Sequence, residues 1–107
     1  MYKTIIINTS LEINIDLLDG LDYIILENIE LISTYKLKHN DEIYDFDYLI
    51  LDSKINNTIL SEDGYIITND CFETCVDNYF AIGKKVRTLK SIDEQLSTIL
   101  EYIKGNI

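Results

Sequence analysis

The sequence predicts a single α/β domain over residues 1–107, in which a mainly parallel sheet packs against one C-terminal helix. The chain of 107 residues is 47% hydrophobic and 26% charged, a composition typical of one folded domain rather than of a disordered segment. Several short runs are almost wholly apolar and often β-branched, as in strands that are buried on both faces of a parallel sheet. The absence of proline also favours strands, and the last part of the chain has helical periodicity.

Seven segments have the composition of strands, and polar or glycine-containing stretches separate most of them. They are residues 4–7, 23–26, 29–37, 42–46, 48–51, 65–67 and 79–82. The polar stretch 38–41 favours a tight turn, so that the third and fourth segments would form an antiparallel hairpin or part of a meander. Residues 10–18 fit both a strand and a helix, because their leucines and isoleucines satisfy both periodicities. Residues 56–57 and 61–64 are expected to be loops.

The final segment predicts a helix with a clear beginning and end. Ser91 and Glu94 have the spacing of a capping box, in which each side chain binds the backbone N–H of the other residue. Gly105 suits the C-terminal cap, which gives a helix of about 14 residues and roughly 20 Å. Its apolar residues recur at helical spacing and form one stripe that the strands would cover. The stripe consists of Ile92, Leu96, Ile99, Leu100 and Ile103.

The net charge of −10 is unevenly distributed along the chain. Residues 1–80 carry 16 acidic and 4 basic side chains, a balance of −12, whereas residues 81–107 carry 3 acidic and 5 basic side chains, a balance of +2. Most of the surface would therefore repel nucleic acid and anionic membrane surfaces. No apolar run approaches the ~20 residues of a membrane span, and the first residues lack the layout of a signal peptide. We therefore expect a cytoplasmic protein that binds neither nucleic acid nor membrane.

Residues 64–90, with the sequence GYIITNDCFETCVDNYFAIGKKVRTLK, carry a resemblance to a known family. The segment resembles the end of the FAD-binding domain in thioredoxin reductases and related FAD-dependent pyridine nucleotide-disulfide oxidoreductases. Residues 64–68 match a strand of that domain, Thr74 matches the threonine of the following turn, and residues 80–83 match a second strand. The resemblance implies a small FAD/NAD(P)-binding-like, Rossmann-related domain. At the position of the family's flavin-contacting Asp, however, this chain has Lys84.

The first strand also resembles the family, but the loop that follows it differs. In the family this strand leads into G-x-G-x-x-G, where glycines let the backbone approach the FAD pyrophosphate closely. The corresponding residues here are Asn8, Ser10 and Ile13, whose side chains would occupy space that the pyrophosphate needs. Glu27 follows the second predicted strand, and the resemblance gives it the place of the acidic residue that binds ribose hydroxyls. A solvated strand-end glutamate is the simpler interpretation, because glutamate is common after strands. The resemblance also implies Gly83, Lys84 and Lys85 as remaining cofactor-binding residues.

The redox Cys-x-x-Cys and a complete NADPH domain are missing, and we identify no catalytic residue. We therefore expect a non-catalytic, thioredoxin-reductase-like binding or regulatory module without a cofactor, whose partner is another protein or a second copy of itself in a homodimer. The alternative is an enzyme component. In that case the chain would be the small subunit of a split flavin-dependent disulfide reductase, and a partner chain would complete the FAD site.

Four basic residues stand close together before the predicted helix, and they indicate an anion-binding site. They are Lys84, Lys85, Arg87 and Lys90. Helix N-termini attract anions through free backbone N–H groups and the helix dipole, so phosphate, a nucleotide or an acidic partner would suit this place. A solvated loop that balances an acidic body is the other interpretation.

Cys71 and Cys75 form the remaining candidate site. Their spacing differs from the C-x-x-C of dithiol redox sites, so free thiols are expected in a reducing compartment, with a regulatory disulfide and a thiol-based sensor as the alternative. Two thiols and the distant His39 do not make a zinc site. The acidic residues of 41–52 lack the spacing of a calcium-binding loop, so we expect no metal.

Overall fold

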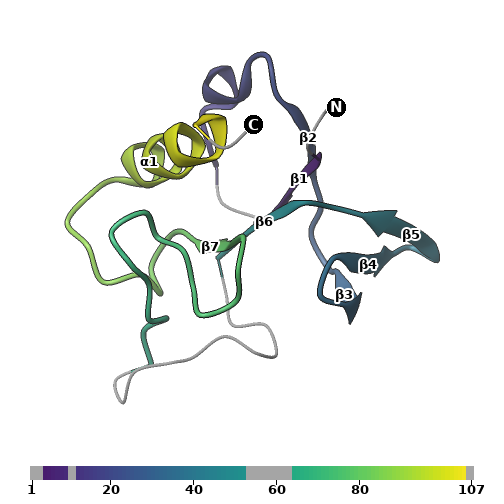
Figure 1. Ribbon diagram of the computed structural model, residues 1–107. Coiled ribbons are helices and arrows are strands. Elements are labelled where there is room, and N and C mark those ends of the chain that lie inside the picture. Colours follow the sequence, from purple (N-terminus) through teal and green to yellow (C-terminus); the bar gives the residue numbers. More distant parts are fainter. Residues whose placement is uncertain (1–3, 10–11, 53–63, 106–107) are drawn as a thin grey trace.

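The structure is a computed structural model that describes residues 4–9, 12–52 and 64–105. The described chain forms seven strands, one 3-10 helix and one α-helix (Figure 1). In chain order these are β1 (Thr4–Asn8), the 3-10 helix η1 (Ile15–Leu18), β2 (Asp22–Ile25), β3 (Glu30–Ser33), β4 (Lys36–His39), β5 (Glu42–Asp45), β6 (Tyr48–Leu51), β7 (Tyr79–Ala81) and α1 (Ile92–Lys104).

The parallel sheet has the strand order β2-β1-β6-β7. Strand β1 lies at its centre, where Ile5 pairs with Tyr23 of β2 on one side and with Tyr48 of β6 on the other. Ile5, Ile6 and Ile7 are wholly buried, as expected for a parallel strand that is covered on both faces. The predicted strands 4–7, 23–26, 48–51 and 79–82 are thus confirmed to within a residue or two at their ends.

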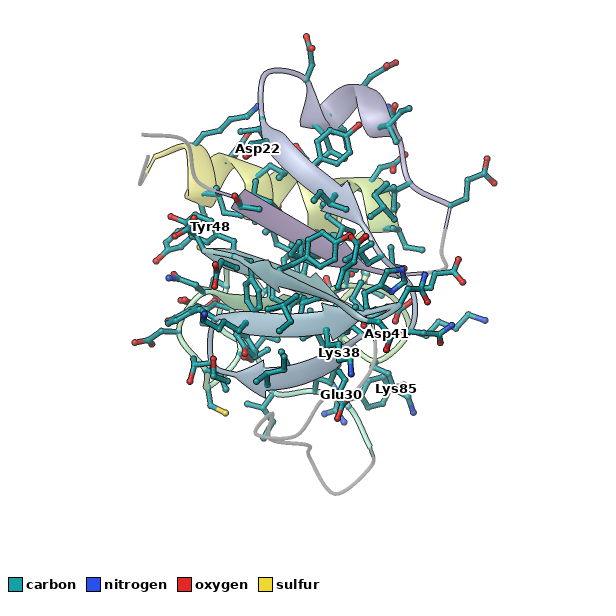
Figure 2. The ribbon with its side chains drawn as sticks, turned by 90° about the vertical axis from the view of Figure 1, so that its right-hand side faces the viewer. Asp22, Glu30, Lys38, Asp41, Tyr48 and Lys85 are labelled. Atoms are coloured by element: carbon teal, nitrogen blue, oxygen red, sulfur yellow. The ribbon has the colours of Figure 1, made fainter. Side chains whose placement is uncertain are left out.

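The second sheet is an antiparallel meander of β3, β4 and β5. The turn between β4 and β5 is formed by Asn40 and Asp41, which have φ angles of 49° and 66°, and this confirms the predicted hairpin. The prediction of one strand over 29–37 is wrong, because the chain reverses at Thr34 and Tyr35 and the register shifts between Leu31 and Ser33. Figure 2 shows the exposed side of the meander, where Lys38 and Asp41 form an ion pair of 3.6 Å.

Helix α1 confirms the predicted beginning, end and apolar stripe. The hydroxyl of Ser91 accepts a hydrogen bond from the backbone N–H of Glu94, whose carboxylate accepts one from the N–H of Ser91. Leu96, Ile99, Leu100 and Ile103 are buried, as is the polar residue Gln95. The helix and the meander lie on opposite sides of the parallel sheet (Figure 1). The buried apolar side chains of all three layers form one cluster.

Tyrosine hydroxyls join the meander to the turn before β7. The hydroxyl of Tyr79 donates to the carbonyl oxygen of Thr34 at 2.5 Å, and the hydroxyl of Tyr35 donates to the carbonyl oxygen of Asp77 at 3.3 Å. The ring of Phe46 contacts the rings of both tyrosines, with centroids 6.1 Å apart in each pair. These contacts hold the reversal between β3 and β4 against the parallel sheet.

The predicted strand 65–67 is wrong, because this segment forms only a single parallel bridge between Ile66 and Val86. The turn expected at Thr74 is present. Its hydroxyl accepts a hydrogen bond from the N–H of Val76 at 3.1 Å, as in turns that serine and threonine stabilise. Residues 10–11 and the loops expected at 56–57 and 61–63 lie outside the described residues. In the rest of the ambiguous stretch 10–18, the chain forms η1 rather than a strand.

Candidate functional site

The carboxyl end of the parallel sheet is the first place to look for a binding site. The chain leaves β1 for β2 on one side and later returns to β6 on the other. In open α/β sheets, ligands bind outside the carboxyl ends of the strands where the strand order reverses in this way. Here that place lies between the ends of β1 and β6, beside the end of β2.

Side-chain hydrogen bonds cross-link the three strand ends at that place. The amide Nδ2 of Asn8 donates to the carbonyl oxygens of Leu26 at 2.9 Å and of Glu27 at 3.4 Å, which joins β1 to the end of β2. The hydroxyl of Thr9 donates to the Oδ2 of Asp52 at 2.8 Å, which joins β1 to the end of β6. Thr9 is only 4% exposed. The strand ends are therefore tied together by side-chain groups that a glycine would lack.

Between β1 and β2, the described residues 9 and 12–21 form no α-helix that would present free N–H groups to a phosphate. The next helical element is the four-residue η1, and the side chain of Asn14 caps it by accepting from the N–H of Asp16. The N–H of Asn14 donates to the Oδ1 of Asp93 in α1 at 3.1 Å. Of the three residues predicted to fill the pyrophosphate space, Asn8 binds the end of β2, Ile13 packs against the core and Ser10 lies outside the described residues.

Glu27 follows β2 as predicted and has an exposed side chain. It lies at the carboxyl end of the sheet, where its backbone carbonyl oxygen accepts a hydrogen bond from Asn8. Sequence reasoning missed the contribution of Thr9 and Asp52 to this edge. The signal was present, since each residue is polar and directly follows a buried strand.

The turn after β7 is held by a buried amide. Gly83 has a φ of 91°, and its backbone N–H donates to the Oε1 of Gln95 at 2.8 Å in a buried hydrogen bond. The Nε2 of Gln95 donates to the carbonyl oxygen of Lys90 at 2.9 Å. One side chain of α1 thus fixes both ends of the basic segment 84–90. Gln95 was not predicted as a site residue. Its position next to Leu96 of the apolar stripe could have indicated a buried polar side chain.

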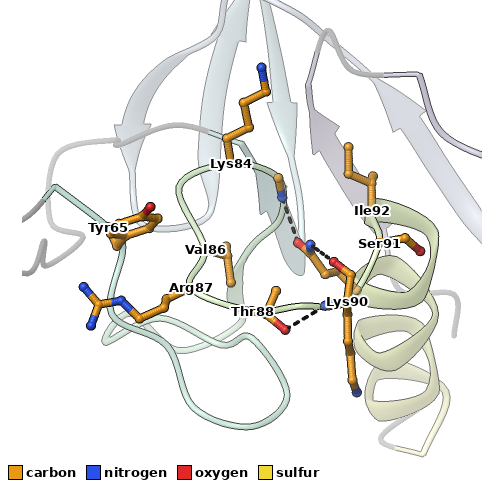
Figure 3. Close-up of a pocket in the computed structure, with 10 residues that line it drawn as sticks. Tyr65, Lys84, Val86, Arg87, Thr88, Lys90, Ser91 and Ile92 are labelled. Carbon is orange, nitrogen blue, oxygen red and sulfur yellow. Dashed lines mark hydrogen bonds between the residues drawn. The ribbon is translucent and has the colours of Figure 1, made fainter.

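Three of the four predicted anion-binding residues line one open pocket. The pocket has a volume of about 520 Å³, and Lys84, Arg87 and Lys90 lie on its wall while Lys85 does not. Figure 3 shows that their charged groups point in different directions, with Lys84 upward, Arg87 to the lower left and Lys90 downward. The guanidinium of Arg87 lies 5.0 Å from the centre of the Tyr65 ring. The three cations therefore surround the pocket without converging on one point inside it.

The N-terminus of α1 already has an anion of its own. The carboxylate of Glu94 accepts the N–H of Ser91 at 3.1 Å, and hydrogen bonds from the backbone and hydroxyl of Ser91 lower the pKa of Glu94 below its usual value. Asp93 adds a second carboxylate in the first turn. Because carboxylates at this end interact favourably with the helix dipole, the attraction that was expected to draw a phosphate here is largely satisfied.

The remaining predictions concern the two cysteines, metal binding and membrane-spanning helices. Cys71 is half-buried and Cys75 is exposed, and no disulfide joins them. Among the residues that the structure describes, no group of three or more histidine, cysteine, aspartate or glutamate side chains is placed to hold a metal ion. Within those same residues, no helix has the length and apolar character needed to cross a membrane.

The sequence was compared with known families and proteins. No protein-family model matches the chain, and no curated protein matches it. The small α/β fold with its parallel and antiparallel sheets thus rests on the structure itself.

Proposed function

We propose that this chain is a non-catalytic, protein-binding module whose fold is related to the FAD-binding domain of thioredoxin reductases. One observation carries the proposal: the hydrogen bonds of Asn8 and Thr9 close the carboxyl end of the parallel sheet. In a dinucleotide-binding domain the backbone at this edge must be open to the pyrophosphate.

The topology supports the relationship to Rossmann-type domains. The order β2-β1-β6-β7 has the same arrangement as the centre of the doubly wound sheet, in which the first strand lies between the second and the next parallel strand to follow. The meander lies between β2 and β6, and a helix follows β7. Of the two strands that the resemblance matches, residues 80–83 overlap β7, whereas residues 64–68 form only the single bridge of Ile66. The finer assignment to the thioredoxin reductase family rests on this topology together with the resemblance.

The residues present do not fit bound FAD. A pyrophosphate at the end of β1 needs close backbone approach and the N-terminus of a helix. The side chains of Asn8 and Thr9 are committed to neighbouring strands, and a four-residue 3-10 helix stands where the long helix would begin. At the second flavin contact, the lysine Lys84 replaces a carboxylate and is exposed. We therefore assign no cofactor and no reaction step to this edge of the sheet.

Disulfide reduction requires a nicotinamide site, a flavin and a dithiol. A chain without a flavin site cannot carry out this reaction by itself. We therefore assign it a binding function, in which its surface contacts another protein. A protein partner also agrees with the uneven charge of the chain, since the balance of −12 over residues 1–80 and of +2 over 81–107 favours oriented association.

Spectroscopy of the purified chain tests this proposal. We expect no flavin absorbance after purification, no quenching of FAD fluorescence when the chain is titrated into FAD, and no NADPH-dependent reduction of a disulfide reporter. A flavin-dependent disulfide reductase measured in parallel is the positive control. Tight uptake of FAD by the chain alone would overturn the proposal. Uptake only in the presence of a second polypeptide would instead favour the split-reductase alternative.

A further inference from the structure

The basic segment 84–90 belongs to a surface that combines positive charge with exposed apolar side chains. We call it the basic–apolar surface, and define it by Tyr65, Ile67, Lys84, Arg87, Leu89 and Lys90. Leu89 is fully exposed at 106%, Ile67 is 52% exposed and Tyr65 is 37% exposed. A leucine that contacts so little of its own fold, between two cations, gains no stability from burial in this chain and is available to a partner.

This surface is hollowed along its length. The pocket of about 520 Å³ adjoins a smaller one of about 190 Å³, and the two share Tyr65 and Arg87 on their walls. The larger pocket contains Lys84 and Lys90, and the smaller one contains Ile67. The two pockets therefore adjoin at Tyr65 and Arg87, and Leu89, which lines neither of them, lies in the chain between the lining residues Thr88 and Lys90. Tyrosine and arginine are also the residue types most enriched among those that dominate the energetics of protein interfaces.

The arrangement of the cations favours an extended ligand over a single small anion. The head groups of Lys84, Arg87 and Lys90 point in different directions around the larger pocket (Figure 3), so one phosphate group would meet only one of them. Lys90 lies 5.8 Å from the centre of the Phe72 ring, and its Nζ donates to the hydroxyl of Thr98 at 3.4 Å, which directs it along the side of α1. A chain that bears several carboxylates can reach these cations in turn.

Charge complementarity identifies the kind of partner. Residues 84–90 contain four basic side chains and no acidic one, whereas residues 1–80 have a balance of −12. An anionic membrane is a wide surface that would also face this acidic body, while a narrow acidic peptide would contact the basic–apolar surface alone. The complementary ligand thus carries negative charge in a short, slender segment.

We propose that the basic–apolar surface binds an extended, acidic segment of a partner protein, with at least one large apolar side chain of that segment packed against Leu89 and Tyr65. This inference rests on the proposed function as a protein-binding module and names the chemistry of its partner. The carboxylates of the partner pair with Arg87, Lys90 and Lys84, which gives orientation and salt sensitivity. The apolar contact supplies the part of the affinity that salt does not weaken.

The test is selection of random dodecapeptides on the immobilised full-length chain. We expect the retained peptides to be enriched in Asp and Glu together with Leu, Ile or Phe. The most enriched peptide is then titrated by fluorescence anisotropy against purified variants. The double variant Arg87→Gln/Lys90→Gln should bind it about three- to thirtyfold more weakly, which is the range expected for two exposed ion pairs. The variant Leu89→Ser should bind about tenfold more weakly at any salt concentration.

Two matched variants serve as controls on other surfaces. The double variant Lys36→Gln/Lys38→Gln removes the same charge from the exposed side of the meander, where both lysines form surface ion pairs. Ile43→Ser removes a side chain that is 64% exposed. Both should bind the peptide as the wild type does, and all four variants should keep the wild-type melting temperature.

The proposal is overturned if no peptide is retained, if the retained peptides lack acidic residues, or if the meander variants lose as much affinity as those of the basic–apolar surface. Vesicles of phosphatidylcholine with and without phosphatidylserine are tested in the same buffer. Binding to the anionic vesicles that Leu89→Ser abolishes would replace the peptide by a membrane as the ligand. FAD titration of the same samples distinguishes failure of the proposed function from failure of the present inference. FAD uptake refutes the function as a binding module. If neither FAD nor a peptide binds, only the inference of an acidic peptide ligand is refuted.

Discussion

Replacement of Gln95 by alanine should destabilise the domain far more than an ordinary substitution on a helix. The change leaves the buried N–H of Gly83 without the acceptor that it meets at 2.8 Å, and an unsatisfied buried donor costs about 1–3 kcal/mol. It also removes the 2.9 Å hydrogen bond to the carbonyl of Lys90, which is worth about 1 kcal/mol. The higher helix propensity of alanine returns about 0.3 kcal/mol. The net loss is therefore roughly 2–4 kcal/mol.

Urea unfolding followed by circular dichroism measures this loss. For a domain of this size, each kcal/mol lowers the melting temperature by about 4–8 °C, so Gln95→Ala should melt roughly 8–30 °C below the wild type. The urea midpoint should fall without a change in slope, because the surface exposed on unfolding is unchanged. Glu101→Ala is the matched control, since Glu101 has a side chain of similar size on the exposed side of the same helix.

The control should stay within about 0.5 kcal/mol of the wild type. A Gln95→Ala variant that is equally close to the wild type would refute the reasoning, because it would mean that the Gly83 N–H finds another acceptor at little cost. The turn after β7 would then not depend on α1 for its position.

Three further predictions concern single groups. Tyr79→Phe removes the hydroxyl bound to Thr34 and should cost about 1 kcal/mol in urea unfolding at neutral pH. Burial raises the pKa of Tyr79 above 10.0. The stabilisation by its neutral hydroxyl is therefore complete below pH 10 and is lost as the pH rises through the raised value. The melting temperature of the variant should fall less than that of the wild type when the pH is raised above 10. Asp41→Gly should raise stability by about 0.5 kcal/mol, because glycine adopts this positive φ without strain; a decrease in the urea midpoint would contradict this. Glu94 has a pKa below the usual 4.5, so its contribution to stability is present above pH 4.5 and is lost as the pH falls through the lowered value. Glu94→Gln should therefore reduce the fall in melting temperature between pH 6 and pH 3. A fall identical to that of the wild type would count against the capping box.

The parts of the fold that were predictable have strong local signals. The segments that form β1 and β6 are apolar at nearly every position, as in strands that are buried on both faces of a parallel sheet. Their composition alone therefore identifies them as strands. Helix α1 begins at Ser91 because the serine and Glu94 satisfy each other's N–H groups, a contact made entirely within four residues. The reversal at Thr34 and Tyr35 has no such local signal. It contains neither glycine nor proline and depends on Tyr79, 45 positions away.

The candidate site was predictable in its residue types but not in its geometry. Sequence reasoning identified Lys84, Arg87 and Lys90 as neighbours, and they do share a pocket. It did not reveal that Arg87 lies against Tyr65 and that Glu94 occupies the helix terminus. These details come from contacts between segments that meet only in the folded chain. The same holds for the hydrogen bond between Thr9 and Asp52, which are 43 positions apart.

The meander inserted between β2 and β6 has a consequence for how the chain folds. Strand β1 must find β6, with Ile5 opposite Tyr48, and closure of such a long loop is slow and entropically costly. The hairpin of β4 and β5 joins residues that are close in sequence, such as His39 and Glu42, and can form in microseconds. Once formed, it shortens the effective length of chain between β1 and β6. Early formation of this hairpin would therefore lower the entropic cost of pairing β1 with β6 below that of an unstructured connection of the same length.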